Sequence, residues 1–217
     1  MPVAAVVFDL DGVLLDSEVV WNEVKREVTV EAGGRWRDDA PQAMMGMSSG
    51  EWSRYLHEEL GVPLSPGEIN DAVVARVADR YRRRLPLLPG AVEAVERMAR
   101  RWPLALASSS NRPIIDLVLR HPGLDGRFRA SVSSEEVGRG KPAPDVYLAA
   151  AEALGVPATE AAAIEDSSNG ILAGRAAGMR VIAIPNRDYP PRPDALAQAD
   201  VVLNSLDELT VEVVDEQ

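Results

Sequence analysis

The sequence predicts an α/β protein, a three-layer sandwich with a parallel sheet at its centre and a helical domain inserted into it. Six short apolar runs lack polar alternation, as strands buried on both faces do. Helical segments separate the later runs, and this alternation implies right-handed crossovers between parallel strands. Residues 9–103 separate the first run from the second, and most of that stretch carries only helical signals.

The expected elements of the α/β core can be placed by their boundary residues. The second helix below has Pro144 in its first turn and Gly155 past its end, and Gly178 closes the third. The strands are expected at 3–8, 104–107, 129–132, 161–164, 181–184 and 201–203, and the helices between the later strands at 111–120, 144–154 and 169–177.

The inserted segment has its own helix signals. One helix is expected at 16–32, and two more begin at the capping boxes Ser48-x-x-Glu51 and Ser65-x-x-Glu68. Prolines 86 and 89 then break the chain before 91–102 resumes the core pattern. The sequence therefore predicts a helical domain at 15–88, inserted into a core formed by 1–14 and 89–217.

Composition excludes several classes of function. The chain of 217 residues has 23 Lys and Arg against 34 Asp and Glu, a net charge of −11, so nucleic acid is not an expected partner. The absence of cysteine excludes a disulfide scaffold, a thiolate zinc site and a cysteine nucleophile. No apolar run is long enough for a membrane span, and the first residues lack the basic region of a signal peptide. We expect a soluble, cytoplasmic protein.

Polar side chains gather where the predicted strands end. Ligands of parallel sheets bind outside the carboxyl ends of the strands. Carboxylates, hydroxyls and one cation converge on that edge here: Asp9 and Asp11 after the first strand, the Ser108–Asn111 cluster after the second, Lys141 after the third, and Glu165 with Asp166 after the fourth.

This group of carboxylates requires a cation. Two carboxylates about 4 Å apart repel by ~1 kcal/mol in water and ~4 kcal/mol at an effective dielectric constant near 20. Oxygen ligands without cysteine favour Mg²⁺, which completes its coordination with waters and substrate phosphate. Lys141 and the hydroxyl of Ser108 would then neutralise and orient phosphoryl oxygens.

With these residues in order, the chain resembles the haloacid dehalogenase-like (HAD) hydrolase superfamily, in the branch of phosphatases and β-phosphoglucomutase-like enzymes with a C1 cap. The family's motifs match four segments, which are Val6–Val13 (hhhDxDGh), Leu106–Ser109, Lys141–Asp145 (the start of KPxPxxY/F) and Ile164–Gly170. The helical insert stands where that family places its cap, so the likeness covers the whole chain.

The resemblance implies a role for each site residue. Asp9 is the expected nucleophile, which forms an aspartyl-phosphate, and Asp11 is the general acid and base. Ser108, Ser109 and Lys141 are expected to bind the phosphate. Mg²⁺ is expected on Asp9, Asp166 and the backbone carbonyl of Asp11, with Glu165 a further ligand, directly or through water. The dehalogenase branch replaces the second aspartate, so Asp11 argues against dehalogenation.

Other interpretations of the same motifs are weaker. Asp9-x-Asp11-Gly12 could begin a calcium loop, but Leu14 and Val20 stand where an EF-hand needs Gly and Glu. Residues 138–143 fit the GxGxxA form of a dinucleotide fingerprint, but prolines 142 and 144 deny the helix that such a site needs. His57 and His121 do not support a Ser-His-Asp site, and 80–84 is interpreted as a solvated, basic helix end.

The inserted domain is expected to select the substrate. Trp36 and Trp52, with methionines 44, 45 and 47, are interpreted mainly as its core. Cap loops of the family face the active site, which makes Gly46, Ser49 and Trp52 candidate substrate contacts.

The sequence thus predicts a Mg²⁺-dependent phosphatase for a small phosphate monoester, such as a sugar or polyol phosphate, acting as a monomer or weak homodimer. A β-phosphoglucomutase-like sugar phosphate mutase stays open, although Trp21 and Ser49 stand where those mutases have a hinge His and a cap-loop Arg. A protein of the same fold that only binds a phosphorylated ligand is the second alternative.

Overall fold

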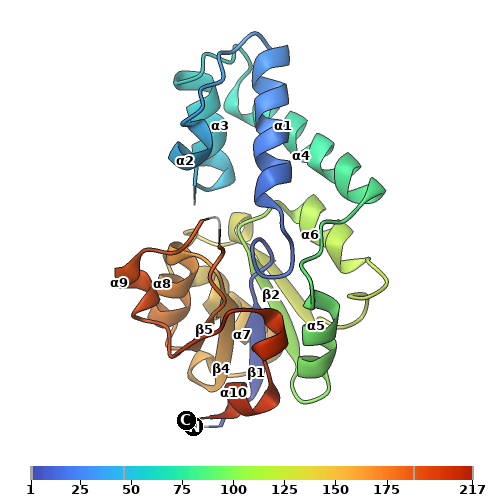
Figure 1. Ribbon diagram of the computed structural model, residues 1–217, viewed down its shortest axis with the longest axis vertical. Helices are drawn as coiled ribbons and strands as arrows, with labels where there is room; N and C mark the ends of the chain where they lie inside the picture. The colour runs from blue at the N-terminus through green and yellow to red at the C-terminus, as the bar shows by residue number, and fades with distance from the viewer. Residues whose placement is uncertain (1, 46, 188, 217) are drawn as a thin grey trace. The chain divides into compact units, whose positions relative to one another are not determined.

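The chain folds around a parallel six-stranded sheet, in a computed structural model that describes residues 2–45, 47–187 and 189–216 (Figure 1). The strand order is β3-β2-β1-β4-β5-β6, and every neighbouring pair is parallel. The predicted α/β sandwich is therefore confirmed. The strands are β1 (Ala5–Phe8), β2 (Leu104–Ser108), β3 (Ala130–Ser133), β4 (Ala161–Glu165), β5 (Arg180–Ala183) and β6 (Val201–Val202).

Helices cover both faces of this sheet. Right-handed crossovers put α5 and α6 on one face and α7, α8 and α9 on the other, because the chain reverses its direction across the sheet after β3. These helices are α5 (Ala91–Ala99), α6 (Arg112–Leu119), α7 (Asp145–Leu154), α8 (Ser168–Ala176) and α9 (Pro193–Leu196), and α10 (Val211–Asp215) ends the chain. Single 3-10 turns are η1 (Ser134–Glu136), η2 (Ala158–Glu160) and η3 (Leu206–Glu208).

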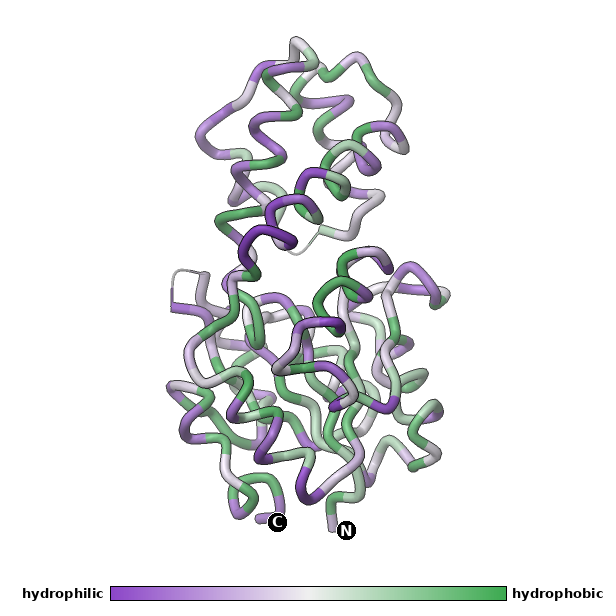
Figure 2. Tube along the Cα trace, turned by 90° about the vertical axis from the view of Figure 1, so that its right-hand side faces the viewer, coloured by the Kyte–Doolittle hydropathy of each residue, from purple (hydrophilic) through white to green (hydrophobic). Residues whose placement is uncertain are grey.

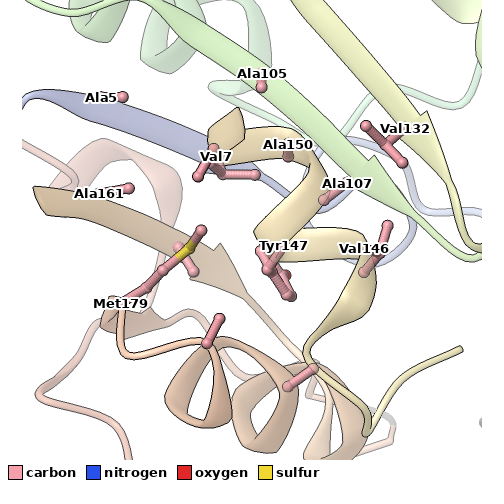
Figure 3. Close-up of a cluster of buried hydrophobic side chains, with 14 residues drawn as sticks. Ala5, Val7, Ala105, Ala107, Val132, Val146, Tyr147, Ala150, Ala161 and Met179 are labelled. Carbon is pink, nitrogen blue, oxygen red and sulfur yellow. The ribbon is translucent and has the colours of Figure 1, made fainter. Parts of the chain in front are cut away.

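The core on the α7 side is built from small residues. Alternate residues of β1 and β2 are alanine or valine, so α7 packs close to the strands (Figure 3). Tyr147 is the largest fully buried side chain in this part of the structure and lies among them (Figure 3). The close packing fixes Tyr147 beneath the carboxyl ends of the strands, where its hydroxyl meets the polar site.

Some elements differ from expectation at their ends. The segment 91–102, expected to resume the core pattern, is helical only as far as Ala99, and Pro103 disfavours helical backbone at Trp102. The indole of Trp102 donates instead to the carbonyl of Val3, at 2.8 Å. Strand β3 lies one residue later than expected, and α2 (Ala40–Ala43) was not expected.

The chain divides into two compact units, one of residues 1–16 and 87–217 and the other of 17–86. The second unit is helical, with α1 (Glu18–Glu31), α2, α3 (Ser49–Glu58) and α4 (Pro66–Arg83). Both predicted capping boxes are present at the starts of α3 and α4. Hydrophobic and hydrophilic stretches are mixed along the trace (Figure 2), and in α4 the buried residues recur every three or four positions, as in an amphipathic helix.

The two connections between the units meet at one place on the α/β unit. Leu15 forms an antiparallel bridge with Leu87, and the amide of Leu88 donates to the carbonyl of Leu14 at 2.9 Å. The division falls two residues inside the expected limits of 15 and 88 at each end. Among the residues described, no helix is both long and apolar enough to cross a membrane.

Candidate active site

The candidate site lies where the strand order changes direction. The strands β2 and β3 continue from one side of β1, and β4, β5 and β6 from the other. The loops that follow β1 and β4 therefore leave toward opposite faces of the sheet, and in parallel sheets this is the place at the carboxyl edge where ligands bind. Asp9 follows β1 directly, and Glu165 ends the neighbouring strand β4. The amide of Asp9 donates to the carbonyl of Ile164 at 2.9 Å, so these two strand ends are held together.

Lys141 joins the carboxylates of both strands. Its buried ammonium donates to Asp9 Oδ1 at 2.8 Å, to Glu165 Oε1 at 2.6 Å and to the carbonyl of Ala107 at 3.1 Å. It also lies 4.9 Å from the centre of the Tyr147 ring. Burial acts to lower the pKa of Lys141, but the two carboxylates outweigh it and hold that pKa above its usual value. Lys141 is therefore a permanent cation beside Asp9.

Both carboxylate oxygens of Glu165 accept hydrogen bonds from several donors. Its Oε1 accepts from Lys141 and from the hydroxyl of Tyr147 at 2.7 Å. Its Oε2 accepts from the amides of Asp166 and Ser167 and from the Ser167 hydroxyl, at 3.0–3.2 Å. Burial acts to raise the pKa of Glu165, but Lys141 and these donors bring it below its usual value. Glu165 is therefore an ionised group that orients Lys141 and the loop that carries Asp166.

Asp9 and Asp166 lack such compensation. Burial raises the pKa of Asp9 to about 7, since Lys141 only partly offsets burial and the charges of Glu165 and Asp11. Burial, followed by the charges of Glu165 and Asp9, raises the pKa of Asp166 well above its usual value. Asp166 Oδ1 is buried and has no hydrogen-bond partner within the described part of the chain. Such a pair of carboxylates is suited to a cation that is not a side chain.

The carboxylates that could hold a metal ion are close to one another. Asp9, Glu165 and Asp166 each offer an oxygen within 4.8 Å of the others. Gly12 makes room for this group, because a Cβ at that position would lie 1.9 Å from Asp166 Oδ2. Its φ of +82° is also a conformation that favours glycine. The Asp11 carboxylate is not in this cluster of described residues.

Asp11 is instead held by two serines. Its Oδ2 accepts from the hydroxyl of Ser110 at 2.7 Å and from that of Ser108 at 3.3 Å. Ser109 is exposed, and its hydroxyl lies 3.5 Å from that of Ser134. The structure thus brings Ser108 and Lys141 to the site and turns Ser109 to the surface.

The sequence predicts no role of its own for Ser110, which it places only in the Ser108–Asn111 cluster, or for Tyr147, which stands at the Y/F position of the KPxPxxY/F motif. The signal for Ser110 was available, because side chains two residues apart on an extended strand share one face. Ser108 at the end of β2 and Ser110 just beyond it are both buried, whereas Ser109 between them is not.

The residues expected to contact substrate from the insert lie in the helical unit. Trp52 is buried, and its ring meets that of Trp21 edge to face at 6.2 Å. The ammonium of Lys25 lies 5.2 Å from the centre of the Trp52 ring and 5.8 Å from that of Trp21. Ser49 is buried in the first turn of α3. Gly46, the third candidate, lies outside the described residues.

The two histidines take part in local turns. His57 Nδ1 lies 2.9 Å from the carbonyl of Val62, and His121 Nδ1 accepts from the amide of Gly123 at 3.2 Å. Neither contact involves a residue of the candidate site.

The sequence of this chain is similar to those of known hydrolases. The family model "haloacid dehalogenase-like hydrolase" matches residues 3–178. Hexitol phosphatase B of Escherichia coli (strain K12) is 36% identical over 214 residues, which cover 96% of this chain and 95% of that protein. The bifunctional riboflavin kinase/FMN phosphatase of Arabidopsis thaliana is 31% identical over 211 residues, and the chain spans only 55% of its length.

A solved structure shares the fold across nearly its full length. CbbY from Rhodobacter sphaeroides, whose structures include complexes with phosphate and with xylulose-(1,5)bisphosphate, has a TM-score of 0.87 to this chain. The two sequences are 27% identical, and the match covers 98% of this chain and 99% of CbbY.

Proposed function

Because this chain belongs to the haloacid dehalogenase-like hydrolase family, we propose that it is a Mg²⁺-dependent phosphatase that hydrolyses a small sugar or polyol phosphate. The observation that carries the proposal is the buried Asp9 carboxylate at the end of β1, 2.8 Å from Lys141 and two residues before a second carboxylate, Asp11. A carboxylate is a nucleophile that needs no general base once it is ionised.

In the first step, one oxygen of Asp9 attacks the phosphorus of the monoester and the bond from phosphorus to the alcohol oxygen breaks. Asp11 gives its proton to that oxygen, so the product leaves as a neutral alcohol. Lys141 and Ser108 donate to the phosphoryl oxygens, whose negative charge they offset as the phosphoryl group transfers.

In the second step, water attacks the phosphorus of the aspartyl-phosphate. Asp11, now a carboxylate, accepts a proton from that water. The bond between phosphorus and Asp9 breaks, inorganic phosphate leaves, and both aspartates return to their starting states.

The residues present fit a magnesium ion. Asp9 and Asp166 are buried carboxylates with raised pKa values, and Asp166 Oδ1 has no partner among the residues described. Oxygen donors of this kind match the preference of Mg²⁺. Asp9, Asp166 and the backbone carbonyl of Asp11 would hold the ion, and Glu165 would act by orienting Lys141 and the Asp166 loop. When bound, the ion would keep both carboxylates ionised and offset phosphate charge.

The helical unit of residues 17–86 is proposed to act as a cap that selects the substrate. It is inserted only a few residues after Asp9, and its two connections meet at the bridge of Leu15 and Leu87. A lid joined by two adjacent segments can move as one body, which is how lids exclude water from reacting groups. Ser49 and Trp52 are its candidate specificity residues.

Hydrolysis is favoured over isomerisation by the state of Trp21. A mutase must keep water from the aspartyl-phosphate while its sugar reorients, and a hinge base assists the sugar hydroxyl. Trp21 has no acceptor for a proton, and its ring is buried against Trp52.

The test is a panel of phosphorylated sugars and polyols assayed for released phosphate, with glucose 6-phosphate followed separately. The panel includes β-glucose 1-phosphate with a trace of glucose 1,6-bisphosphate. Phosphate release from a polyol or sugar phosphate is expected. Glucose 6-phosphate that accumulates much faster than phosphate would establish the mutase instead, and no turnover of any compound would leave only a binding protein.

A further inference from the structure

The two carboxylate oxygens of Asp11 have different surroundings. Oδ2 accepts from two hydroxyls, those of Ser110 at 2.7 Å and Ser108 at 3.3 Å. Oδ1 is buried and has no hydrogen-bond partner among the residues that the structure describes. A carboxylate with one oxygen anchored and the other free is fixed in rotation, and its free oxygen is the one available to hold a proton.

The two serines differ in what else they must do. A hydroxyl has a single proton to donate. Ser108 is the residue expected to donate to the phosphate, and its contact with Asp11 is the longer one. Once Ser108 turns its proton to a phosphoryl oxygen, Ser110 is the remaining donor to Asp11 Oδ2.

Ser110 itself is held firmly in place. Its amide donates to Ser108 Oγ at 2.9 Å, and its carbonyl accepts from the hydroxyl of Ser133, at the end of β3, at 2.8 Å. The residue is buried, with 6% of its surface exposed. Its hydroxyl therefore points at Asp11 from a backbone that two neighbouring strand ends fix.

From this geometry we propose that Ser110 is a positioning residue for Asp11: it anchors Oδ2, so that Oδ1 delivers the proton to the leaving alcohol and later takes one from water. This inference rests on the proposed phosphatase function. In the first step the phosphorus–oxygen bond of the ester breaks as the Oδ1 proton passes to the alcohol oxygen. In the second, a proton of the attacking water returns to Oδ1 as the bond between Asp9 and phosphorus breaks.

The test compares two substrates on one enzyme. Sorbitol 6-phosphate has an alkoxide leaving group that needs a proton, whereas p-nitrophenyl phosphate leaves as a stable anion. The quantity to measure is kcat/KM, since it covers only the steps up to formation of the aspartyl-phosphate. Ser110→Ala is expected to lower kcat/KM for sorbitol 6-phosphate roughly tenfold, a part of the 10²–10⁴ that a positioned acid contributes. For p-nitrophenyl phosphate the loss is expected to stay within about twofold.

The ratio of the two kcat/KM values keeps the test independent of folding, because a smaller folded fraction lowers both values equally. Ser110→Cys, which keeps a similar volume but donates weakly, should shift the ratio in the same direction as Ser110→Ala. The control is Ser134→Ala, which removes only the distant contact with Ser109 and should leave the ratio at its wild-type value.

Two outcomes would overturn the inference. Equal losses on both substrates would mean that Ser110 acts on the phosphate or the fold and not on proton transfer. An unchanged ratio with full activity would mean that Asp11 needs no anchor. Wild-type enzyme that releases phosphate from no sugar or polyol phosphate of the panel would instead contradict the proposed function, so the two failures are distinguishable.

Discussion

The Asp9 carboxylate lies beside the ammonium of Lys141 and close to the carboxylates of Glu165 and Asp166. The proposed chemistry depends on the negative charge of Asp9. Asp9→Asn keeps the shape of the side chain and removes the attacking oxygen's negative charge. We expect kcat to fall to background, because Asp9 is the proposed nucleophile. Among the described residues, no other carboxylate at the end of β1 contacts Lys141, so none can take its place. The fold should survive, since Lys141 keeps its bonds to Glu165 and to the carbonyl of Ala107. Phosphate release measures the first effect and circular dichroism the second. If more than a few per cent of wild-type kcat remained, the nucleophile would lie elsewhere.

Single residues of the site were predictable where they follow a strand directly. Asp9, Ser108 and Asp166 stand at strand ends, and parallel strands bring such residues to one edge whatever the order of the strands. The partners of Glu165 were not predictable in the same way. Tyr147 reaches it from α7, and that contact depends on how close the helix packs to the small residues of β1 and β2. Packing distance of this kind is a tertiary property that one sequence does not specify.

At the scale of elements, the capping box at the start of α4 gives a direct test. The hydroxyl and amide of Ser65 donate to Glu68, and the Ser65 oxygen lies 3.4 Å from the Glu68 amide. Ser65→Ala should lower the free energy of unfolding by about 1 kcal/mol, as the loss of such a cap does. Urea unfolding at neutral pH measures it. Ser205→Ala is the control, since the Ser205 side chain makes no cap hydrogen bond; an equal loss there would contradict the assignment.

The same cap predicts a dependence on pH. Hydrogen bonds from Ser65 hold the pKa of Glu68 below its usual value of 4.5. A carboxyl group whose pKa is lowered in the folded state stabilises the fold at pH values above its unfolded-state pKa. That contribution is lost as the pH falls through the lowered, folded-state pKa. The difference in unfolding free energy between wild type and Ser65→Ala should therefore shrink in acid. A difference that grew as the pH fell would show that the ionised Glu68 is not the partner.

Elements were predictable to the extent that their signals are local. Each capping box, at Ser48 and at Ser65, is a pattern of four consecutive residues, and α3 and α4 begin at these positions. The order of the strands has no such signal, because it depends on which side of β1 each crossover takes. The short helix α2 was missed, since four residues with a proline do not show helical periodicity.

For the whole molecule, removing the metal tests whether the protein needs Mg²⁺. The chain has a net charge of −11, and the site adds buried carboxylates that repel one another without a cation. Chelation with EDTA should abolish turnover, and Mg²⁺ should restore it. A readout without substrate is thermal unfolding: Mg²⁺ should raise the Tm of the chelated protein, because an ion that binds only the folded state stabilises it. Asp166→Asn should remove this rise, whereas Asp125→Asn, at an exposed position, should keep it. Full activity after exhaustive chelation would exclude the metal.

The bridge between Leu15 and Leu87 has a consequence for how the gene can be rearranged. Residues paired across an antiparallel bridge lie roughly 4.5–5.5 Å apart, so the chain leaves the α/β unit and returns to it at nearly one point. Insertions whose ends are adjacent cost little and are tolerated as long surface loops are. A short Gly-Ser link in place of residues 17–86 should therefore give a folded minimal hydrolase, slow on p-nitrophenyl phosphate and indifferent to the alcohol. The helical unit could then be exchanged between relatives without disturbing the α/β unit. Such an exchange is a route by which one α/β unit acquires new substrates.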